Sequence, residues 1–375
     1  MSSWLISFSK HGMRLCRSMP NEYQSHYGLA CYVFSRTLVN RLSSNARKYQ
    51  QPDTGFNRDL TTLLTNIRKE LVTMLPQLRE VSNYLFDERG KQIRPMLVYL
   101  TARACNYHTD PKKESKLTEG QSAIGVISEM IHTASLIHDD VIDAAHIRRG
   151  KPTINSVWGQ KKAILTGDYI LSRATVALSK LRNERVVIVL SQVLDDLVQG
   201  EFMQLGSKED RGERFNHYIK KTFRKTASLM ACSCKAVAIL ADPLNQFLHD
   251  VAFNFGMHFG ISFQLIDDLL DFIASDDVMG KPTSTDLRLG LATAPVLYAC
   301  DRFPELDAMI MRRFTQSGDV QRAREIVDQS DGMDQTKRLA CFHRDEAIRF
   351  ISQLGESMER NALIQLSDDV VTRHK

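Results

Sequence analysis

HDDVID at residues 138–143 and DDLLD at residues 267–271 each end an apolar stretch with helical periodicity. The chain has five Asp-Asp doublets, but only these two carry a third Asp at the fifth position, so a doublet alone is weak information. On a helix, positions i, i+1 and i+4 lie within an arc of roughly 100°, and i and i+4 are neighbours on successive turns. Each triad therefore directs three carboxylates toward one point.

The carboxylates of both triads require a cation between them. Like charges at i and i+4 destabilise a helix by roughly 0.2–0.5 kcal/mol, and burying them unpaired costs far more. Carboxylates without Cys or regularly spaced His suit Mg²⁺, Mn²⁺ or Ca²⁺ rather than Zn²⁺. Mg²⁺ usually completes its shell with substrate phosphate oxygens, so the pattern predicts a metal-bound diphosphate; a solvated acidic helix face is the alternative. The predicted metal ligands are Asp139, Asp140, Asp143, Asp267, Asp268 and Asp271.

The charge of the chain is concentrated at its N-terminus. Residues 1–50 hold seven Lys or Arg against one acidic residue, whereas the remaining 325 residues carry 42 basic and 43 acidic side chains. The body is therefore neutral, and nothing in it indicates a nucleic-acid partner. With 375 residues and 43% hydrophobic content, the chain can bury a large core in one big domain or two ordinary ones.

The basic N-terminal segment is also rich in Ser, and its apolar residues could form one side of a short basic helix. This composition is typical of a mitochondrial transit peptide, with a disordered tail as the alternative. We therefore expect residues 1–54 to lie outside the fold, residues 55–375 to form one all-α domain, and the protein to work in the mitochondrial matrix or on the matrix face of the inner membrane. No apolar run approaches the roughly 18 residues of a membrane span, which leaves only peripheral membrane contact open.

The seven Cys residues show no paired framework. Cys232 and Cys234 form the only close pair, without a second pair to complete a zinc site. We expect reduced structural thiols.

Apolar residues recur at helical spacing through most of the chain, and no alternating strand pattern competes with them. Pro76 is expected to bend or end the first helix. Gly256 and Gly260, four residues apart, allow another helix to approach closely, and the doublet at residues 195–196 is interpreted as surface charge. Helices are predicted over 56–86, 96–105, 119–143, 159–181, 184–205 and 215–240, from near Phe247 to the second triad, and as shorter segments without chemistry from 293 onward.

Basic residues lie where a diphosphate would need them. Lys91 and Arg94 precede a helix, where the backbone dipole favours an anion. Arg148 and Arg149 follow the first triad closely enough to reach the same pocket, and an Arg fork binds diphosphate through two donors. Further along the chain, the cations are Lys225, which begins a nearly uncharged run, and Lys281, which lies in a loop able to fold over the site.

Together these motifs resemble the all-trans polyprenyl diphosphate synthases, and specifically the long-chain, two-subunit members that make the ubiquinone side chain. The resemblance covers roughly residues 60–370. It implies an all-α isoprenoid synthase fold whose helices surround a deep central cavity, with the triads facing each other across its mouth. The motifs, in order, are Gly90-Lys91 with Arg94-Pro95, the first triad, Arg148-Arg149-Gly150, Lys225-Thr226, Phe263-Gln264, the second triad and Gly280-Lys281.

The resemblance also implies roles. Mg²⁺ held by the two triads would bridge an allylic diphosphate, and the reaction would be its extension with isopentenyl diphosphate. No side-chain base is needed if the released diphosphate takes the proton, so His132, His138 and His146 are expected to be structural. The allylic diphosphate would be bound by Arg148, Lys225, Thr226, Gln264 and Lys281, and isopentenyl diphosphate by Lys91, Arg94 and Arg149.

Two residues depart from the family pattern. Gln121 is taken as the counterpart of a His that binds isopentenyl diphosphate, and Leu291 stands where many members have a Lys near the allylic site. We therefore expect a weakened catalytic site that depends on a partner, in a dimer or in a heterotetramer with a second homologous subunit.

Product length depends on residues below the first triad, where the resemblance implies that bulky side chains stop the growing product. Here Ala134 and Ser135 occupy those positions. Helix geometry places Ser135 on the Asp face and Ala134 away from it, so spacing leaves open which residue matters. Both are small, which predicts a long product.

Two other functions are compatible with part of this pattern, a terpene cyclase and a non-catalytic stabilising subunit. A terpene cyclase would need only one set of phosphate-binding cations and usually mixes Asn, Ser and Glu in its second metal motif. A non-catalytic stabilising subunit would be expected to have lost aspartates, and none is missing here.

Overall fold

The computed structural model describes residues 56–86, 92–112, 116–148, 150–206, 211–273 and 284–373, which belong to one compact unit, Phe56–Lys375. Within them the sole sheet is an antiparallel pair, β1 (Ile147–Arg148) and β2 (Lys151–Pro152). The helices are α3 (Phe56–Glu70), α4 (Pro76–Leu85), α5 (Ile93–Thr109), α6 (Glu119–Ile142), α7 (Ile154–Trp158), α8 (Gln160–Lys180), α9 (Glu184–Leu205), α10 (Arg211–Thr222), the π-helical turn η1 (Phe223–Ala227), α11 (Ser228–Ala241), α12 (Gln246–Ile273), α14 (Thr285–Arg288), α15 (Ala294–Ala299), α16 (Glu305–Met311), α17 (Asp319–Gln329), α18 (Gly332–Ile351) and α19 (Met358–Thr372).

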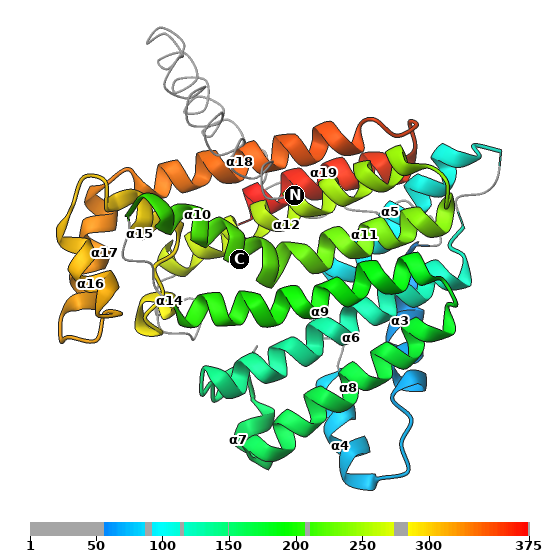
Figure 1. The fold of residues 1–375 in the computed structure, drawn as a ribbon, viewed down its shortest axis with the longest axis horizontal. Coiled ribbons are helices and arrows are strands. Elements are labelled where there is room, and N and C mark those ends of the chain that lie inside the picture. The colour runs from blue at the N-terminus through cyan, green and yellow to red at the C-terminus, as the bar shows by residue number, and fades with distance from the viewer. Residues whose placement is uncertain are drawn as a thin grey trace, which may run out of the picture. The chain divides into compact units, whose positions relative to one another are not determined.

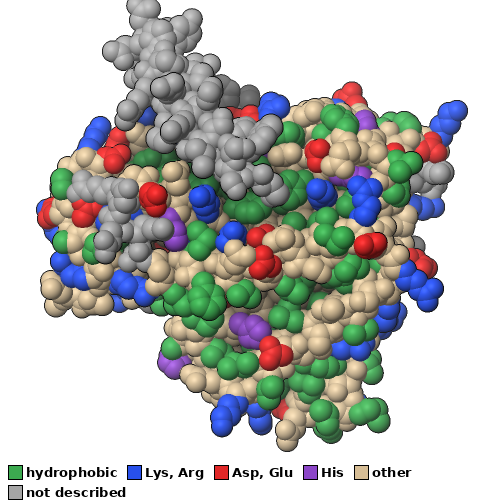
Figure 2. All heavy atoms as spheres, in the orientation of Figure 1, with side chains coloured by type: hydrophobic (Ala, Val, Ile, Leu, Met, Phe, Trp, Pro, Cys, Tyr) green, Lys and Arg blue, Asp and Glu red, His purple; other side chains and the backbone are tan. Residues whose placement is uncertain are grey.

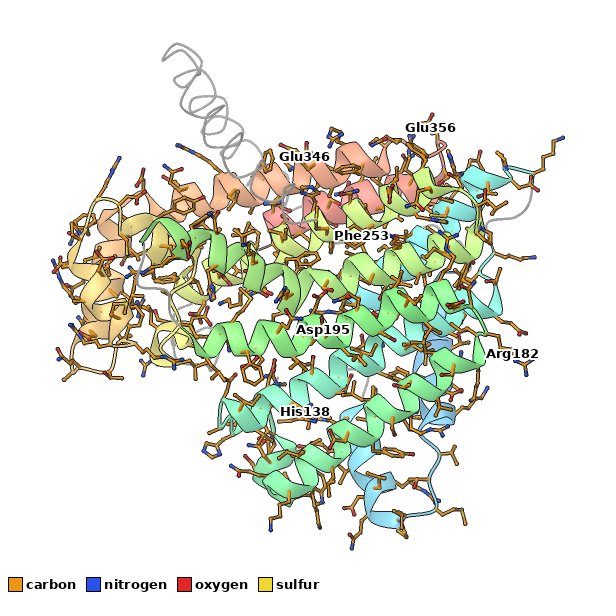
Figure 3. All side chains as sticks on the ribbon, in the orientation of Figure 1. His138, Arg182, Asp195, Phe253, Glu346 and Glu356 are labelled. Carbon is orange, nitrogen blue, oxygen red and sulfur yellow. The ribbon has the colours of Figure 1, made fainter. Side chains whose placement is uncertain are left out.

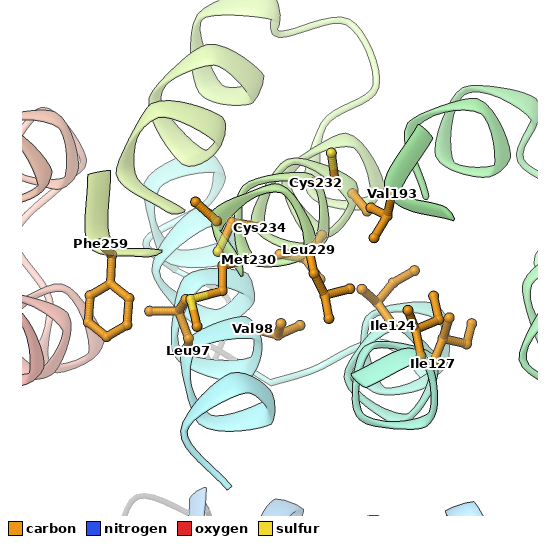
Figure 4. Packing of buried hydrophobic residues seen from close by; sticks show 14 of the residues in the cluster. Leu97, Val98, Ile124, Ile127, Val193, Leu229, Met230, Cys232, Cys234 and Phe259 are labelled. Atoms are coloured by element: carbon orange, nitrogen blue, oxygen red, sulfur yellow. The ribbon is translucent and has the colours of Figure 1, made fainter. Parts of the chain in front are cut away.

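Helix α11 occupies the centre of the bundle. It contacts α12, α9, α5 and α6, and Figure 1 shows α12 and α9 running along its two sides. Lys235 is its single charged residue, and a helix that is apolar on all sides is stable only when other helices surround it. Figure 4 shows Leu229 and Met230 of α11 among side chains of α5 and α6, which positions the triad-bearing α6 against this core.

Helix α12 packs unusually close to α11 because of two glycines. A Cβ atom on Gly256 would lie 2.8 Å from Cα of Ala231, and one on Gly260 would lie 2.6 Å from Cα of Ala227. Real Cβ atoms do not approach backbone this closely, so only glycine fits. The predicted close approach at these two positions is confirmed, and it fixes the height of the second triad relative to η1.

The predicted helices agree with the structure over most of their length. Pro76 was expected to bend or end the first helix; α3 ends at Glu70, and Pro76 is the first residue of α4, where proline is well tolerated. The helix predicted over 215–240 is three segments, α10, η1 and α11. The predicted all-α isoprenoid synthase fold is confirmed. Residues 1–54, the expected transit segment, lie outside the described residues.

Other expectations concern thiols and membranes. Cys105, Cys232 and Cys234 are buried and unbonded, and burial raises the pKa of the Cys232 and Cys234 thiols to about 12, which agrees with a structural role. Among the described helices, none is both long and apolar enough to cross a membrane.

Candidate active site

The first triad lies at the C-terminal end of α6. Asp140 is buried, while Asp139 and Asp143 are half-buried. The backbone turns back after the helix through the β1–β2 hairpin, where Gly150 has φ +74°. This turn brings Arg148 onto the triad, and its Nε donates a 2.7 Å hydrogen bond to Oδ1 of Asp140. The expected pairing of Arg148 with the first triad is therefore present.

Lys225 reaches the same triad from η1. Its Nζ lies 3.7 Å from Oδ2 of Asp139 and donates a 2.5 Å hydrogen bond to Oε2 of Glu201 on α9. Burial raises the pKa of Asp139 to about 6, against the opposing effect of Lys225. Burial lowers the pKa of Lys225, but Asp139 and Glu201 outweigh it and the net shift is upward. Glu201, to which the sequence assigned no role, is thus part of the site.

The π-helical turn η1 connects the two triads. Single π-turns inside helices are frequent at functional sites because they redirect side chains. Oγ1 of Thr226 donates to Oε1 of Gln264 at 2.8 Å, and Nε2 of Gln264 donates to Oδ1 of Asp268 at 2.9 Å. Thr226 and Gln264 therefore lie together, and they link η1 to the second triad.

In the second triad, at the end of α12, neutral donors hold Asp268 and Asp271. The hydroxyl of Tyr218 donates a 2.5 Å hydrogen bond to Oδ2 of Asp268, so both oxygens of this buried carboxylate have partners. Burial raises the pKa of Asp268 to about 6, although the bonds from Tyr218 and Gln264 oppose the rise. Asp271 accepts the backbone N–H groups of Thr285 and Asp286, at 3.0 and 3.1 Å.

A fourth carboxylate adjoins this triad. Asp286 has its pKa raised, first by burial and then by the nearby charges of Asp268 and Asp271. The sequence suggested no role for it, because it stands 15 residues after Asp271 in a segment with no motif of its own.

The C-terminal end of the chain also reaches the second triad. Nη2 of Arg373 donates to Oδ1 of Asp267 at 2.8 Å and to the carbonyl of Phe263 at 2.9 Å. Its guanidinium lies 4.0 Å from the centre of the Phe263 ring, a cation–π contact. Arg373, directly after α19, thus contacts the second triad, although the sequence suggested only packing and surface for this region.

Arg94, in the first turn of α5, contacts a histidine of α6. Its Nη1 lies 3.0 Å from Nε2 of His132, which precedes Asp139 by seven residues and shares its helix face. His132 was expected to be structural, and the seven-residue spacing is the signal that could have placed it here. His138 and His146 do contact structural groups, the carbonyl of Ile164 and the hydroxyl of Ser156.

Gln121 is not at this site, which corrects its assignment as a substrate ligand. It is fully buried near the start of α6, and eighteen residues of helix place it about 27 Å along the axis from Asp139. Its amide forms a capping box with Thr118 and bonds Asn106 and the carbonyl of Val237. These bonds satisfy the side chain internally, so its role is to begin the helix.

The remaining predicted residues divide by what the structure describes. Lys91, Arg149 and Lys281 lie outside the described residues. Ala134 is fully buried, and Ser135 is half-buried with its hydroxyl donating to the carbonyl of His132 at 2.9 Å.

Of the two Asp residues interpreted as surface charge, Asp195 is exposed on α9 (Figure 3). Asp196 is buried and accepts a 2.5 Å hydrogen bond from Ser228, so that interpretation is wrong for it.

The triads fit a hard divalent cation by their chemistry. All six side chains are carboxylates, which are the ligands of Mg²⁺ and Ca²⁺. In the conformation seen here, no three acidic, His or Cys side chains of the described residues are grouped closely enough to hold a metal. The donors around the triads, among them Arg148, Lys225, Tyr218 and Arg373, occupy oxygens that a metal would use.

Comparison with known proteins agrees with this geometry. The family model for polyprenyl synthetase matches residues 75–327. The human all-trans polyprenyl-diphosphate synthase PDSS1 is 55% identical over 91% of this chain and 82% of its own length. The decaprenyl-diphosphate synthase subunit 1 of Schizosaccharomyces pombe is 41% identical over 91% and 95%, and a probable mitochondrial hexaprenyl pyrophosphate synthase of Yarrowia lipolytica is 36% identical over 90% and 88%.

Solved structures show the same architecture. The heptaprenyl diphosphate synthase of Staphylococcus aureus superposes with a TM-score of 0.78 at 28% identity, over 85% of this chain and 99% of that one. The fold, the two triads and these similarities agree, and the chain belongs to the polyprenyl synthetase family of prenyltransferases.

Proposed function

We propose that this protein extends an allylic diphosphate with isopentenyl diphosphate units to a long-chain polyprenyl diphosphate, the precursor of the ubiquinone side chain. The observation that carries the proposal is the bridge between the triads. One helical segment contacts both, through Tyr218 at Asp268 and Lys225 at Asp139. The names of the human, Schizosaccharomyces and Yarrowia relatives, all polyprenyl diphosphate synthases, support the long product.

The six aspartates would hold Mg²⁺, which supplies charge neutralisation for a departing diphosphate. Lys225 and Arg148 would add fixed positive charge there, where negative charge develops as the allylic C–O bond breaks and its electron pair leaves with the diphosphate. Thr226, Gln264 and Lys281 complete the proposed allylic subsite. Arg94 and His132, with Lys91 and Arg149, would hold isopentenyl diphosphate.

The carbon–carbon bond then forms without a protein base. The double bond of isopentenyl diphosphate attacks the allylic cation, and the proton lost from the adduct goes to the released diphosphate. His138 and His146 agree with this scheme, because both are engaged by structural partners. The role of the protein is to bind, orient and exclude water.

Product length is proposed to depend on the small residues that precede Asp139. Replacing Ala134 by Phe should shorten the product by several isoprene units, because the side chain would fill space that the growing chain needs. Replacing Ser135 by Phe is the matched comparison, since Ser135 lies on the Asp face. Reversed-phase chromatography measures the product length. An unchanged length in both variants refutes the proposal that small residues before Asp139 allow a long product.

The catalytic chain is proposed to work with a second homologous subunit, as a dimer or heterotetramer. Large apolar side chains remain exposed on α8 and α9, among them Leu165, Ile188 and Phe202, and Figure 2 shows hydrophobic side chains over these helices. Such patches mark protein–protein contacts. Partner dependence now rests on this face and on Leu291, because Gln121 no longer supports it. Phe202→Glu should lower the assembly mass in light scattering, and an unchanged mass would exclude this face.

The alternative is a stabilising subunit without catalysis, which the complete set of six aspartates disfavours. We also propose mitochondrial location, at the matrix or the matrix face of the inner membrane. The basic, Ser-rich composition of residues 1–54 and the mitochondrial designation of the Yarrowia relative support it.

One assay tests the proposed function. The full chain is incubated with farnesyl diphosphate, isopentenyl diphosphate and Mg²⁺, alone and with a candidate partner subunit, and the products are sized. Long products in either condition are expected. No incorporation in both conditions refutes catalysis, and activity only with the partner supports partner dependence.

A further inference from the structure

Helix α10 and η1 present three polar side chains to the space between the triads. Tyr218, Lys221 and Lys225 are spaced i, i+3 and i+7, which places them along one face of a helical segment. The first contacts Asp268 of the second triad and the last lies near Asp139 of the first. Lys221 is therefore placed between the contacts made with the two triads. Figure 1 shows α10 leading into α11, with α9 alongside.

Lys221 has no ion pair or hydrogen bond within the described part of the chain. Its Nζ lies 5.5 Å from the centre of the Tyr218 ring, a cation–π contact. Burial lowers the pKa of Lys221, while the charges of Asp268 and Asp286 oppose this shift. A half-buried ammonium costs free energy unless an anion compensates it, and Asp268 and Asp286 act on Lys221 without a direct ion pair, so the position suits a further anionic partner in direct contact.

The surrounding pocket has room for such an anion. A cavity of about 80 Å³ is lined by Lys221, Tyr218, His217, Arg214 and Leu291, with others. Arg214 is committed to Asp307 at 2.5 Å, and His217 bonds the carbonyl of Met203 at 2.9 Å. These bonds leave Lys221 and Arg313 as the cations of the lining that could meet an anion, and of the two Lys221 is on the helix face that contacts the triads. Leu291 faces the same space without a charge.

From this arrangement we propose that Lys221 binds the allylic diphosphate and supplies the positive charge that Leu291 cannot. The assignment rests on the proposed function and extends it by one binding residue from α10. Leu291 then does not leave the site without a cation, because Lys221 of α10 supplies the charge from a different element.

The test measures binding of inorganic diphosphate to the full chain at saturating Mg²⁺ by isothermal titration calorimetry. Lys221→Met should weaken binding about tenfold, as loss of a charged hydrogen bond does. The matched control is Lys220→Met, the exposed neighbour on the same helix, which should bind within twofold of wild type. Lys221→Arg keeps the charge and should retain most of the affinity.

The decisive arm is rescue from across the pocket. Leu291→Lys in the Lys221→Met background should restore most of the affinity and lower the KM for the allylic substrate, with kcat less affected. Thermal unfolding followed by circular dichroism checks that each variant is folded, and Lys221→Gln replaces Lys221→Met if the latter does not fold.

Three results would overturn the assignment. Wild-type affinity in Lys221→Met would show that the diphosphate does not use this side chain. Weakened binding that neither Lys221→Arg nor Leu291→Lys restores would show a packing role. If wild-type protein binds no diphosphate at all, the proposed function fails, and this assignment with it.

Discussion

At the end of α6, Asp139 and Asp140 face the cations Lys225 and Arg148, whereas at the end of α12, Asp268 and Asp271 are held by a tyrosine hydroxyl, an amide and backbone N–H groups. Both triads have the same spacing in the sequence. In the first triad, cations pair with Asp139 and Asp140, whereas in the second a cation, Arg373, pairs with Asp267 and neutral donors hold the other two carboxylates. Motifs of equal spacing are thus held by different mixtures of charge and neutral hydrogen bonds.

The helices that carry the triads also differ in how they are packed. Helix α12 packs against α11 and η1 through two glycines and against α18 through a buried histidine pair, whereas α6 packs against α8, α5 and α11. Rigid support suits a site that must hold a metal-bound anion in one place. We therefore expect changes at α6 to act mainly on catalysis, and changes around α12 to act also on stability and metal affinity.

The largest expected effect is on the first triad. Asp139→Asn should lower kcat at least about 100-fold, because it removes a ligand charge where the leaving diphosphate is stabilised. Asp195→Asn, at the exposed member of a doublet without a third Asp, is the control and should retain full activity. Steady-state rates at saturating Mg²⁺ measure both. A loss under fivefold at Asp139 would remove the first triad from the reaction.

The next effect is a pH dependence of stability that comes from the packing of α12 against α18. Nδ1 of His258 lies 2.9 Å from Nδ1 of His343 on α18, and burial lowers the pKa of His258 from 6.5 to about 4. Below pH 6.5 the unfolded chain binds protons that the folded chain does not, so stability falls as pH falls toward 4. This group alone should cost about 2 kcal/mol of unfolding free energy between pH 7 and pH 5.

Urea unfolding at the two pH values measures this contribution. The double variant His258→Phe with His343→Phe keeps aromatic packing and should show a smaller decrease. An equal decrease in the variant would place the pH dependence elsewhere in the chain.

A third effect tests the close packing under the second triad. Gly260→Ala would place a Cβ atom 2.6 Å from Cα of Ala227, and such overpacking should lower the unfolding free energy by about 1–3 kcal/mol. Gly120→Ala on α6 is the control, because its Cβ would meet flexible side-chain ends rather than backbone, namely Leu240 at 3.3 Å and Leu181 at 3.8 Å. Equal stability of the two variants in denaturant titrations would contradict the close approach.

The smallest effect concerns the neutral donors of the second triad. Tyr218→Phe removes the hydroxyl that orients Asp268, and outer partners of metal ligands are worth about 10–100-fold in affinity. We expect the Mg²⁺ concentration for half-maximal activity to rise about tenfold with little change in fold. Tyr169→Phe, whose hydroxyl bonds backbone carbonyls near α3, is the control. No change at Tyr218 would mean that packing alone orients Asp268.

Much of this architecture could be predicted from the sequence, since helical periodicity and the i, i+1, i+4 aspartates act locally. The contacts made by Tyr218 and Arg373 could not. Tyr218 is 50 residues from Asp268, and Arg373 is 106 residues from Asp267, and neither has a motif of its own. Tertiary packing alone brings them to the triad.

For Gln121, the sequence predicts a substrate-binding role that the structure contradicts. It was assigned by residue type, as a polar substitute for a missing His, without following the helix register to Asp139. His132, seven residues before that aspartate, has the correct register and meets Arg94. Asp196 was judged from its doublet, although its burial depends on contacts with α11 that no local pattern reveals.

The central claim is that the two differently built triads hold one metal–diphosphate complex. Electron paramagnetic resonance of Mn²⁺ titrated into the full chain, with and without inorganic diphosphate, tests it directly in wild type, Asp139→Asn and Asp267→Asn. The account predicts diphosphate-dependent Mn²⁺ binding in wild type and its loss in each single variant. Full diphosphate-dependent binding in either variant would show that one triad suffices, and would contradict the claim.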